Sequence, residues 1–243
     1  MSGTTILDDG ELRMDGIQTN STIRLDGGIV TGRGFVGHIT ANSGGTVAPG
    51  FGGAQYESAL HCRNVTLNPA TTFRPVLTSS SPDFEGHKLQ VAGSVILGGS
   101  QLAVDLYTTF KPTNSASFVI IDNDGNDAIN GTFAGLPEGA TIPAEGVLFR
   151  ISYAGGTGND VVLTRVPAPP SNMSTVAKMP NGQMRVSGLG IPGLIYTIQT
   201  TTNLIPVIQW TQIGTTTAAT DGYFHFLQNP TASPQRFYRA ISP

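Results

Sequence analysis

Short alternations of apolar and polar residues run along the chain from residue 4 to about residue 106, between turns rich in glycine, aspartate and asparagine. The segments are TILDDGELRMDG, STIRLDGGIVTG, GFVGHITANSGGTVAPG, CRNVTLNPATTFRPVL and KLQVAGSVILGGSQLAVDL. A period of two residues is typical of a half-buried β-strand, and each segment can hold a strand of about four to seven residues. No window keeps the i, i+3, i+4, i+7 spacing of a helix without an interrupting Gly or Pro. We therefore predict an all-β fold.

The strand–turn–strand pieces are each too small to bury an apolar face alone, which favours a stack of coils whose neighbours complete the core. The alternative is an ordinary antiparallel sandwich. Two of the turn regions, NSGGTVAPG and AGSVILGGSQLAVDL, lack the two-residue hairpin signals of an antiparallel meander. The pattern thus indicates a parallel β-helix, or solenoid. We interpret Phe118–Leu163, with its Gly/Asp turns, as the closing coils.

A Pro-rich segment, PAPPSN, follows Val166 and marks the expected domain boundary, because proline cannot pair within a sheet and stiffens a linker. We assign residues 1–166 to the β-helix domain, 167–174 to the linker and 175–243 to a small β-sandwich-like domain. The expected strands of this second domain are QMRVSGL, LIYTIQTT, WTQIGTTTA, YFHFLQ and RFYRAI. Its candidate core anchors are Trp210, Phe224, Phe226, Phe237 and Tyr238.

Charge and cysteine content narrow the function. The chain has 243 residues, a net charge of −3 and only 12% charged residues, so it lacks the basic surface that nucleic acids require. Cys62 is the single cysteine, which excludes an intramolecular disulfide and a multi-cysteine zinc site. The first residues do not form a signal peptide, and no apolar run reaches the ~20 residues of a membrane span. We expect Met1 to begin a piece of a longer secreted protein.

Several motifs carry a family resemblance: TVAPG at 46–50, NVTLNPATTF at 64–73 and KLQVAGSVILGGSQLAV at 88–104. Through them, residues 20–166 resemble the autotransporter-associated β-strand repeat proteins. Through YTIQTTTNL, DGYFHF and RFYRA, the remainder is similar to the small C-terminal β-domain of secreted proteins from Verrucomicrobia-like bacteria. The resemblance implies a right-handed parallel β-helix, an extracellular or cell-surface location, and an adhesive, attachment or sorting role. It implies polysaccharide or cell-surface partners and transfers no catalytic residue.

Two acidic turns are candidate calcium sites. The run from Asp122 through Asp124 to Asp127 resembles the first half of a calcium loop, although the closing Glu is missing. The segment GGTGNDV, which contains Asp160, matches one copy of the calcium-binding nonapeptide repeat. A Ca²⁺ site would need the two turns to lie alongside each other. The alternative is that Asp and Asn simply bond to the backbone amides of their own turns.

Histidine spacing suggests a transition-metal site. His38, His61 and His87 are separated by 23 and 26 residues, close to the length of one coil, so they could stack on one face. Asp83 and Glu85 alternate with His87 and would share one side of a strand. Imidazole and carboxylate ligands on a rigid sheet could bind Zn²⁺. Cys62 would point away from the adjacent His61, because neighbouring strand residues face opposite sides.

Two functions follow as hypotheses. The first is a structural or adhesive segment of a secreted or cell-surface protein, with no catalytic motif and with self-association through the open end of the first coil. The alternative is a metal-dependent hydrolase of phosphate or carboxylate esters, or a carbohydrate-acting enzyme, on the β-helix face. An aromatic strip for stacking on sugars would come from Tyr107, Phe110, Phe118, Phe133 and Phe149.

Overall fold

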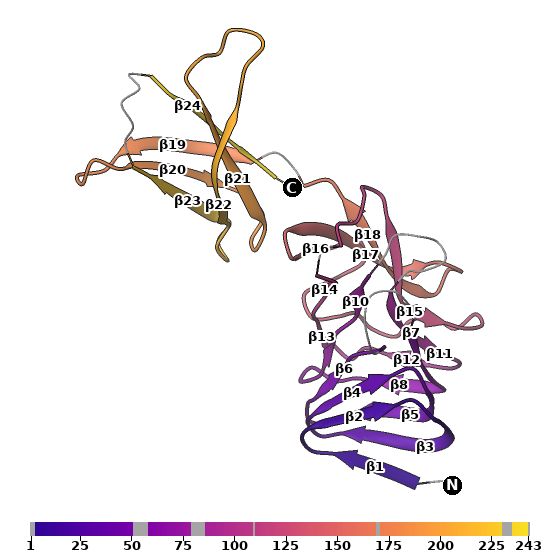
Figure 1. The fold of residues 1–243 in the computed structure, drawn as a ribbon. Helices are drawn as coiled ribbons and strands as arrows, with labels where there is room; N and C mark the ends of the chain where they lie inside the picture. Colours follow the sequence, from indigo (N-terminus) through magenta and orange to yellow (C-terminus); the bar gives the residue numbers. More distant parts are fainter. Residues whose placement is uncertain are drawn as a thin grey trace. The chain divides into compact units, whose positions relative to one another are not determined.

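The protein is described by a computed structural model over residues 3–50, 58–78, 86–108, 110–168, 171–229 and 235–242. These ranges contain strands and turns and no helix, which confirms the all-β prediction (Figure 1). None of them, therefore, forms a helix long and apolar enough to cross a membrane. The chain divides into two compact units, the first ending at Val166 and the second beginning at Pro167, with residues 143–148 grouped with the second.

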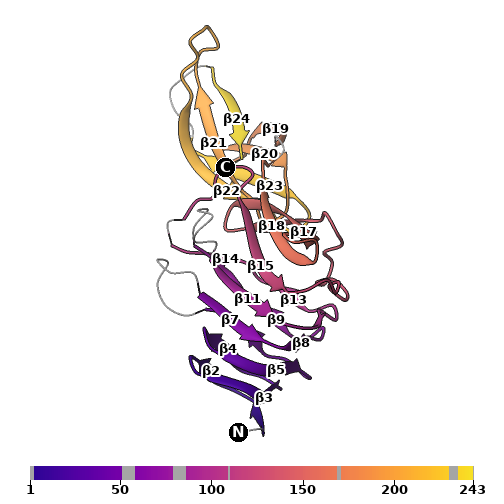
Figure 2. The ribbon, with the colours of Figure 1, turned by 90° about the vertical axis from the view of Figure 1, so that its right-hand side faces the viewer.

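The first unit contains two ladders of parallel strands that alternate along the chain (Figures 1 and 2). One ladder runs through β1 (Gly3–Leu7), β3 (Ile17–Leu25), β5 (Phe35–Ala41), β7 (Ser58–Cys62) and β11 (His87–Val91), with β8 (Asn64–Thr66) and β12 (Val95–Ile96) at its side. The other runs through β2 (Glu11–Met14), β4 (Ile29–Gly32), β6 (Thr46–Val47), β9 (Thr72–Phe73) and β13 (Gln101–Leu102). A separate pair joins β10 (Val76–Leu77) to β14 (Asp105–Leu106).

The offset between paired residues grows along the first ladder. Gly3 lies beside Ser21, 18 residues further on, whereas Leu89 lies beside Ile121, 32 residues further on. The connecting turns therefore lengthen while the strands stay in register. This is why no strict repeat is visible in the sequence.

Alternating burial places one side of each strand in the core. In β11, His87, Leu89 and Val91 are buried while the residues between them are partly exposed. Buried apolar residues line up from strand to strand, as in the row Ile23, Ile39, Val65 and Val95. Each such side chain contributes about 1.5–3 kcal/mol by leaving water, so the rows hold successive strands together.

The parallel arrangement ends at β15 (Ser117–Asn123). This strand pairs in parallel with β11 on one side and antiparallel with β18 (Asp160–Val166) on the other, and β17 (Val147–Gly155) and β16 (Thr141–Ala144) follow. The segment Phe118–Leu163 thus does not continue the parallel ladder, contrary to our interpretation of it as closing coils. An antiparallel strand satisfies the main-chain groups that a parallel ladder would leave open at its last edge.

Aromatic residues of this region form core rather than a surface strip. Phe118, Phe133 and Phe149 are at most 1% exposed, and Phe118 packs edge-on against Phe149 with ring centroids 6.0 Å apart. The predicted sugar-stacking strip is therefore wrong for these three residues. Alternation alone did not show that both faces of β15 are covered.

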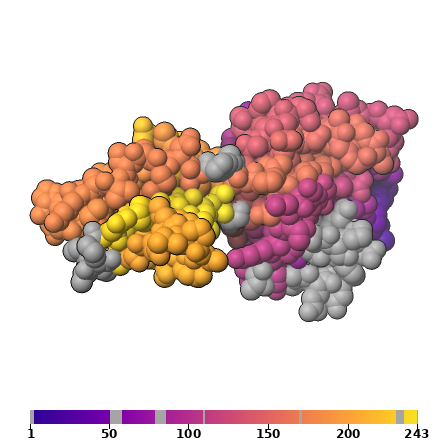
Figure 3. All heavy atoms as spheres, turned by 90° about the horizontal axis from the view of Figure 1, so that it is seen from above, coloured from indigo at the N-terminus to yellow at the C-terminus, as the bar shows by residue number. Residues whose placement is uncertain are grey.

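The second unit consists of two three-stranded antiparallel sheets (Figure 1; orange to yellow in Figure 3). One contains β19 (Asn172–Lys178), β20 (Met184–Leu189) and β23 (Tyr223–Gln228), and the other contains β22 (Thr211–Thr217), β21 (Ile195–Thr201) and β24 (Phe237–Ile241). The first strand begins at Asn172, inside the predicted linker, because pairing resumes directly after the prolines.

Side chains from both sheets share one core, which is consistent with the predicted β-sandwich. Val186 and Phe224 come from one sheet, and Tyr196 and Ile198 come from the other. The rings of Tyr196 and Phe224 stack at 4.9 Å, and the Tyr196 hydroxyl accepts a hydrogen bond from the Ile191 amide. Of the predicted anchors, Phe224 is fully buried, whereas Trp210 stays partly exposed beside Arg239.

A glycine row shows how tightly successive strands of the second ladder approach. The carbonyl oxygen of Gly10 accepts a hydrogen bond from the Ile29 amide. A Cβ on Gly28, whose φ is +66°, would lie 2.7 Å from that same oxygen. Gly10 has a similar φ of +78° but open space around it.

These two glycines make a matched pair of substitutions. We expect Gly28→Ala to lower the free energy of unfolding by about 1–3 kcal/mol more than Gly10→Ala, since both pay for the left-handed backbone and only Gly28→Ala adds overpacking. Urea denaturation followed by circular dichroism measures the difference. Equal losses in the two variants would contradict this close approach between strands.

Candidate functional site

The two acidic turns that sequence analysis singled out for calcium do lie side by side. The Asp160 carboxylate is 3% exposed and accepts hydrogen bonds of 2.9 Å from the amides of Asn123 and Thr157. The Asn159 side-chain amide donates to the carbonyl oxygens of Asp124 and Asp127, at 3.3 and 3.0 Å. The turns are therefore joined by hydrogen bonds of their own side chains.

Several oxygens that a calcium ion would need are already in use. Both oxygens of Asp160 accept hydrogen bonds, and Asp122 accepts from Gln90 and lies 3.2 Å from the Lys88 ammonium. Asp124 and Asp127 are exposed, and in each case it is the main-chain oxygen that faces Asn159. This geometry favours the reading in which Asp and Asn stabilise turns without an ion.

Asp160 is accordingly expected to be a stability residue that does not depend on calcium. Asp160→Ala leaves two amide donors without their acceptor and should lower the unfolding free energy by about 2–4 kcal/mol. Thermal unfolding with and without a calcium chelator measures it, with Asp127→Ala as the exposed control. A chelator that destabilised the wild type as much as Asp160→Ala does would restore the calcium hypothesis.

The three candidate histidines do not stack. His38 lies beside Asn64, with 2.9 Å between the His38 Nδ1 and the Asn64 Nδ2. His61 lies beside Phe35 and Gln90, on the outer face of the sheet. His87 lies beside Ser58 and points inward, where it is 6% exposed.

Equal sequence spacing did not translate into equal register, because the turns between the strands differ in length. Asp83 and Glu85 lie outside the described residues, as does Glu57. Within the ranges that the structure describes, no group of three or more His, Cys, Asp or Glu side chains is placed to hold a metal ion. The histidines are thus separated into different environments.

Burial lowers the pKa of both His61 and His87. For His61 desolvation is the largest cause, the Lys88 charge adds to it, and Asp122 opposes it. For His87 desolvation is the cause, since the ring packs against Gly50 and its Nε2 has no hydrogen-bond partner. Both imidazoles therefore favour the neutral form.

This predicts a loss of stability in mild acid. A histidine whose folded pKa lies below the usual 6.5 takes up its proton first in the unfolded chain, so the unfolding free energy falls as pH drops below 6.5 and is unaffected above it. His87→Gln should flatten part of this slope. Urea titrations at several pH values measure it, with the exposed His225→Gln as control. An unchanged slope in His87→Gln would contradict the assignment.

A groove of about 300 Å³ runs over the outer face of the first ladder. Its floor follows one register row, in which Phe35, His61, Gln90 and Asp122 come from β5, β7, β11 and β15. The Phe35 ring stacks on His61 with centroids 4.0 Å apart and remains 41% exposed. We call this row the outer groove.

The outer groove changes from apolar to polar along its length. At one end it offers the Phe35 ring, and at the other it offers the Gln90 amide and the carboxylates of Asp122 and Asp124, with Lys88 adjacent. Cys62 lies beneath it, 4% exposed, and burial raises the pKa of its thiol to about 12. The thiol is therefore held neutral and is unsuited to nucleophilic chemistry.

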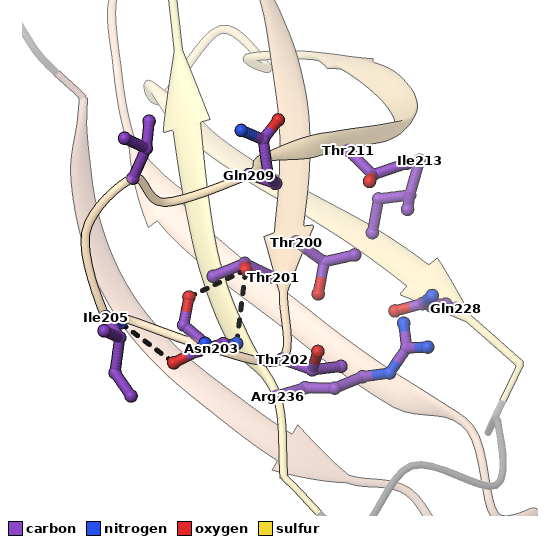
Figure 4. Close-up of a pocket in the computed structure, with 11 residues that line it drawn as sticks. Thr200, Thr201, Thr202, Asn203, Ile205, Gln209, Thr211, Ile213, Gln228 and Arg236 are labelled. Carbon is purple, nitrogen blue, oxygen red and sulfur yellow. Dashed lines mark hydrogen bonds between the residues drawn. The ribbon is translucent and has the colours of Figure 1, made fainter.

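The second unit has a larger pocket, of about 510 Å³, where the ends of β21 and β23 meet the starts of β22 and β24 (Figure 4). Hydroxyl and amide side chains dominate its lining, together with one guanidinium and three aliphatic side chains. The lining residues are Thr200, Thr201, Thr202, Asn203, Ile205, Val207, Gln209, Thr211, Ile213, Gln228 and Arg236. We call it the sandwich-end pocket.

Asn203 shapes one wall of the sandwich-end pocket. Its side-chain oxygen accepts from the Ile205 amide at 2.9 Å, and its carbonyl oxygen accepts from the Thr201 hydroxyl at 3.0 Å (Figure 4). Figure 4 shows Arg236 extending along the pocket toward Gln228. The Nε of Arg236 and the Oε1 of Gln228 are buried atoms with no hydrogen-bond partner.

Sequence reasoning identified His61 and Asp122 but missed Phe35 and Gln90 beside them, and missed the sandwich-end pocket altogether. An aromatic residue at an outward position of an alternating strand, as Phe35 is, was a usable signal. For Arg236 and Gln228 there was none, because they are distant from Thr200 in sequence. Comparisons with protein-family models, with curated proteins and with solved structures find no match for this chain.

Proposed function

We propose that this chain is a structural and adhesive segment of a secreted or cell-surface bacterial protein, built on a right-handed parallel β-helix. The observation that carries the proposal is the pair of parallel ladders whose strands alternate along the chain. Strands that alternate between two ladders, each in parallel register with its own predecessor, are what successive coils of a solenoid produce. Parallel connections within one sheet are right-handed in nearly all proteins, which supports the handedness.

The proposal gives the two units different roles. The β-helix acts as a rigid support, and the β-sandwich serves attachment, sorting or assembly. Self-association belongs to the same proposal: β1 has β3 as its partner on one side, and its residues are largely exposed, including Ile6 at 48%. An exposed strand edge of this kind can pair with a second copy of the chain.

The outer groove supports a polysaccharide partner. The exposed ring of Phe35 offers an apolar face to the C–H side of a pyranose ring, while Gln90 and Asp122 offer an amide and a carboxylate to its hydroxyls. The carboxylate is balanced by Lys88, so the groove suits a neutral glycan better than a charged one. A row that crosses four strands follows the direction of an extended polymer.

Binding of neutral polysaccharides tests this function. Phe35→Ala should weaken binding about tenfold, equivalent to about 1.4 kcal/mol, because the ring supplies the apolar contact. Surface plasmon resonance on a panel of neutral bacterial polysaccharides measures it. Tyr223→Ala, which removes an exposed ring from the second unit, is the matched control.

Two results would contradict the proposal. Equal affinity of the wild type and Phe35→Ala for every polysaccharide bound would remove the groove from the interaction. Release of reducing sugars during incubation would show catalysis and favour the carbohydrate-acting alternative. The metal-dependent hydrolase has no ligand cluster to support it among the residues described.

A further inference from the structure

The sandwich-end pocket contains a cation without a counter-charge. No ion pair involves Arg236 among the described residues, and its Nε is buried without an acceptor. By contrast, Arg239 on the same sheet lies 4.4 Å from the Trp210 ring and donates to Gln199. A buried guanidinium nitrogen that lacks an acceptor costs stability unless a ligand supplies one.

The charge around this pocket is strongly one-sided. Residues 167–243 contain four basic residues, Lys178, Arg185, Arg236 and Arg239, and one acidic residue, Asp221. Asp221 accepts a hydrogen bond from the Tyr223 amide in a turn and does not line the pocket. The field at Arg236 therefore attracts anions.

Gln228 adds the opposite requirement. Its Oε1 is a buried acceptor without a donor, and Figure 4 shows it close to the Arg236 guanidinium. A ligand that satisfies both atoms must carry an anionic acceptor and, next to it, a hydrogen-bond donor. A carboxylate with a neighbouring hydroxyl meets this condition.

The remaining lining extends the match to a sugar. Four threonine hydroxyls can both donate and accept, as the hydroxyls of a sugar do, and the wall made by Ile205 and Val207 is apolar, as the C–H face of a pyranose is. These two side chains are 70% and 85% exposed, so they are available to cover a ligand. The volume of about 510 Å³ is within the range of small-ligand sites.

We propose that the sandwich-end pocket binds a carboxylated sugar residue of an acidic polysaccharide. Arg236 donates from Nε and from an Nη to the carboxylate in a two-point contact, and Gln228 accepts from a ring hydroxyl through Oε1. The site is separate from the outer groove and goes beyond the function proposed above, because it gives the second unit a ligand of its own. A peptide C-terminus carries the same carboxylate but leaves the threonine hydroxyls without partners.

Titration calorimetry on the full chain tests the proposal with trigalacturonate as the probe and its methyl ester as the uncharged match. We expect the free acid to bind at least tenfold more tightly than the ester. Arg236→Gln should reduce its affinity at least tenfold, whereas Arg185→Gln, which removes an exposed charge elsewhere in the unit, should leave it within twofold.

A second variant tests the site even if Arg236→Gln does not fold. Gln228→Glu keeps the size of the side chain and places a carboxylate beside Arg236, so it should raise the melting temperature while abolishing trigalacturonate binding. Phe35→Ala should leave trigalacturonate binding unchanged, which separates this site from the outer groove.

The proposal is overturned if trigalacturonate and its ester bind equally, or if Gln228→Glu binds the acid as the wild type does. It is also overturned if a peptide with a free C-terminal carboxylate binds more tightly than trigalacturonate, with loss on amidation, because the site would then recognise chain ends.

Discussion

Main-chain hydrogen bonds between successive parallel strands are the constraint on which the first unit depends. Each inner strand of a ladder uses its donors and acceptors on two neighbours, so its position is set by both. Side chains then follow by alternation: Leu60 and Leu89 face the core, and His61 and Gln90 face outward. The core and the outer groove are therefore two sides of the same register.

The acidic turns illustrate how polar residues can serve this arrangement without a ligand. Asp160 holds the amides of Asn123 and Thr157, and Asn159 holds carbonyl oxygens of the neighbouring turn. These bonds join the last parallel strand, β15, to the antiparallel strand β18 that covers its edge. A motif resembling half of a calcium site is thus used to close the parallel ladder.

The outer groove and the sandwich-end pocket differ in how completely their polar groups are satisfied. In the groove, Asp122 is paired with Lys88 and Gln90, so its charge is balanced before any ligand arrives. In the pocket, Arg236 Nε and Gln228 Oε1 remain without partners although they are buried. Unsatisfied buried groups carry more information about a ligand than satisfied ones, because a ligand must supply what is missing.

The sequence by itself determined the β character, the inward and outward faces of the alternating strands, the opposite orientation of His61 and Cys62, and the break at the prolines after Val166. These properties depend on near neighbours in the chain. Only the tertiary structure decided which strands pair, that His61 meets Phe35 instead of another histidine, and that Arg236 faces Gln228. The physical reason is that turn length sets the register, and turns that lengthen from one strand to the next leave no period from which it can be calculated.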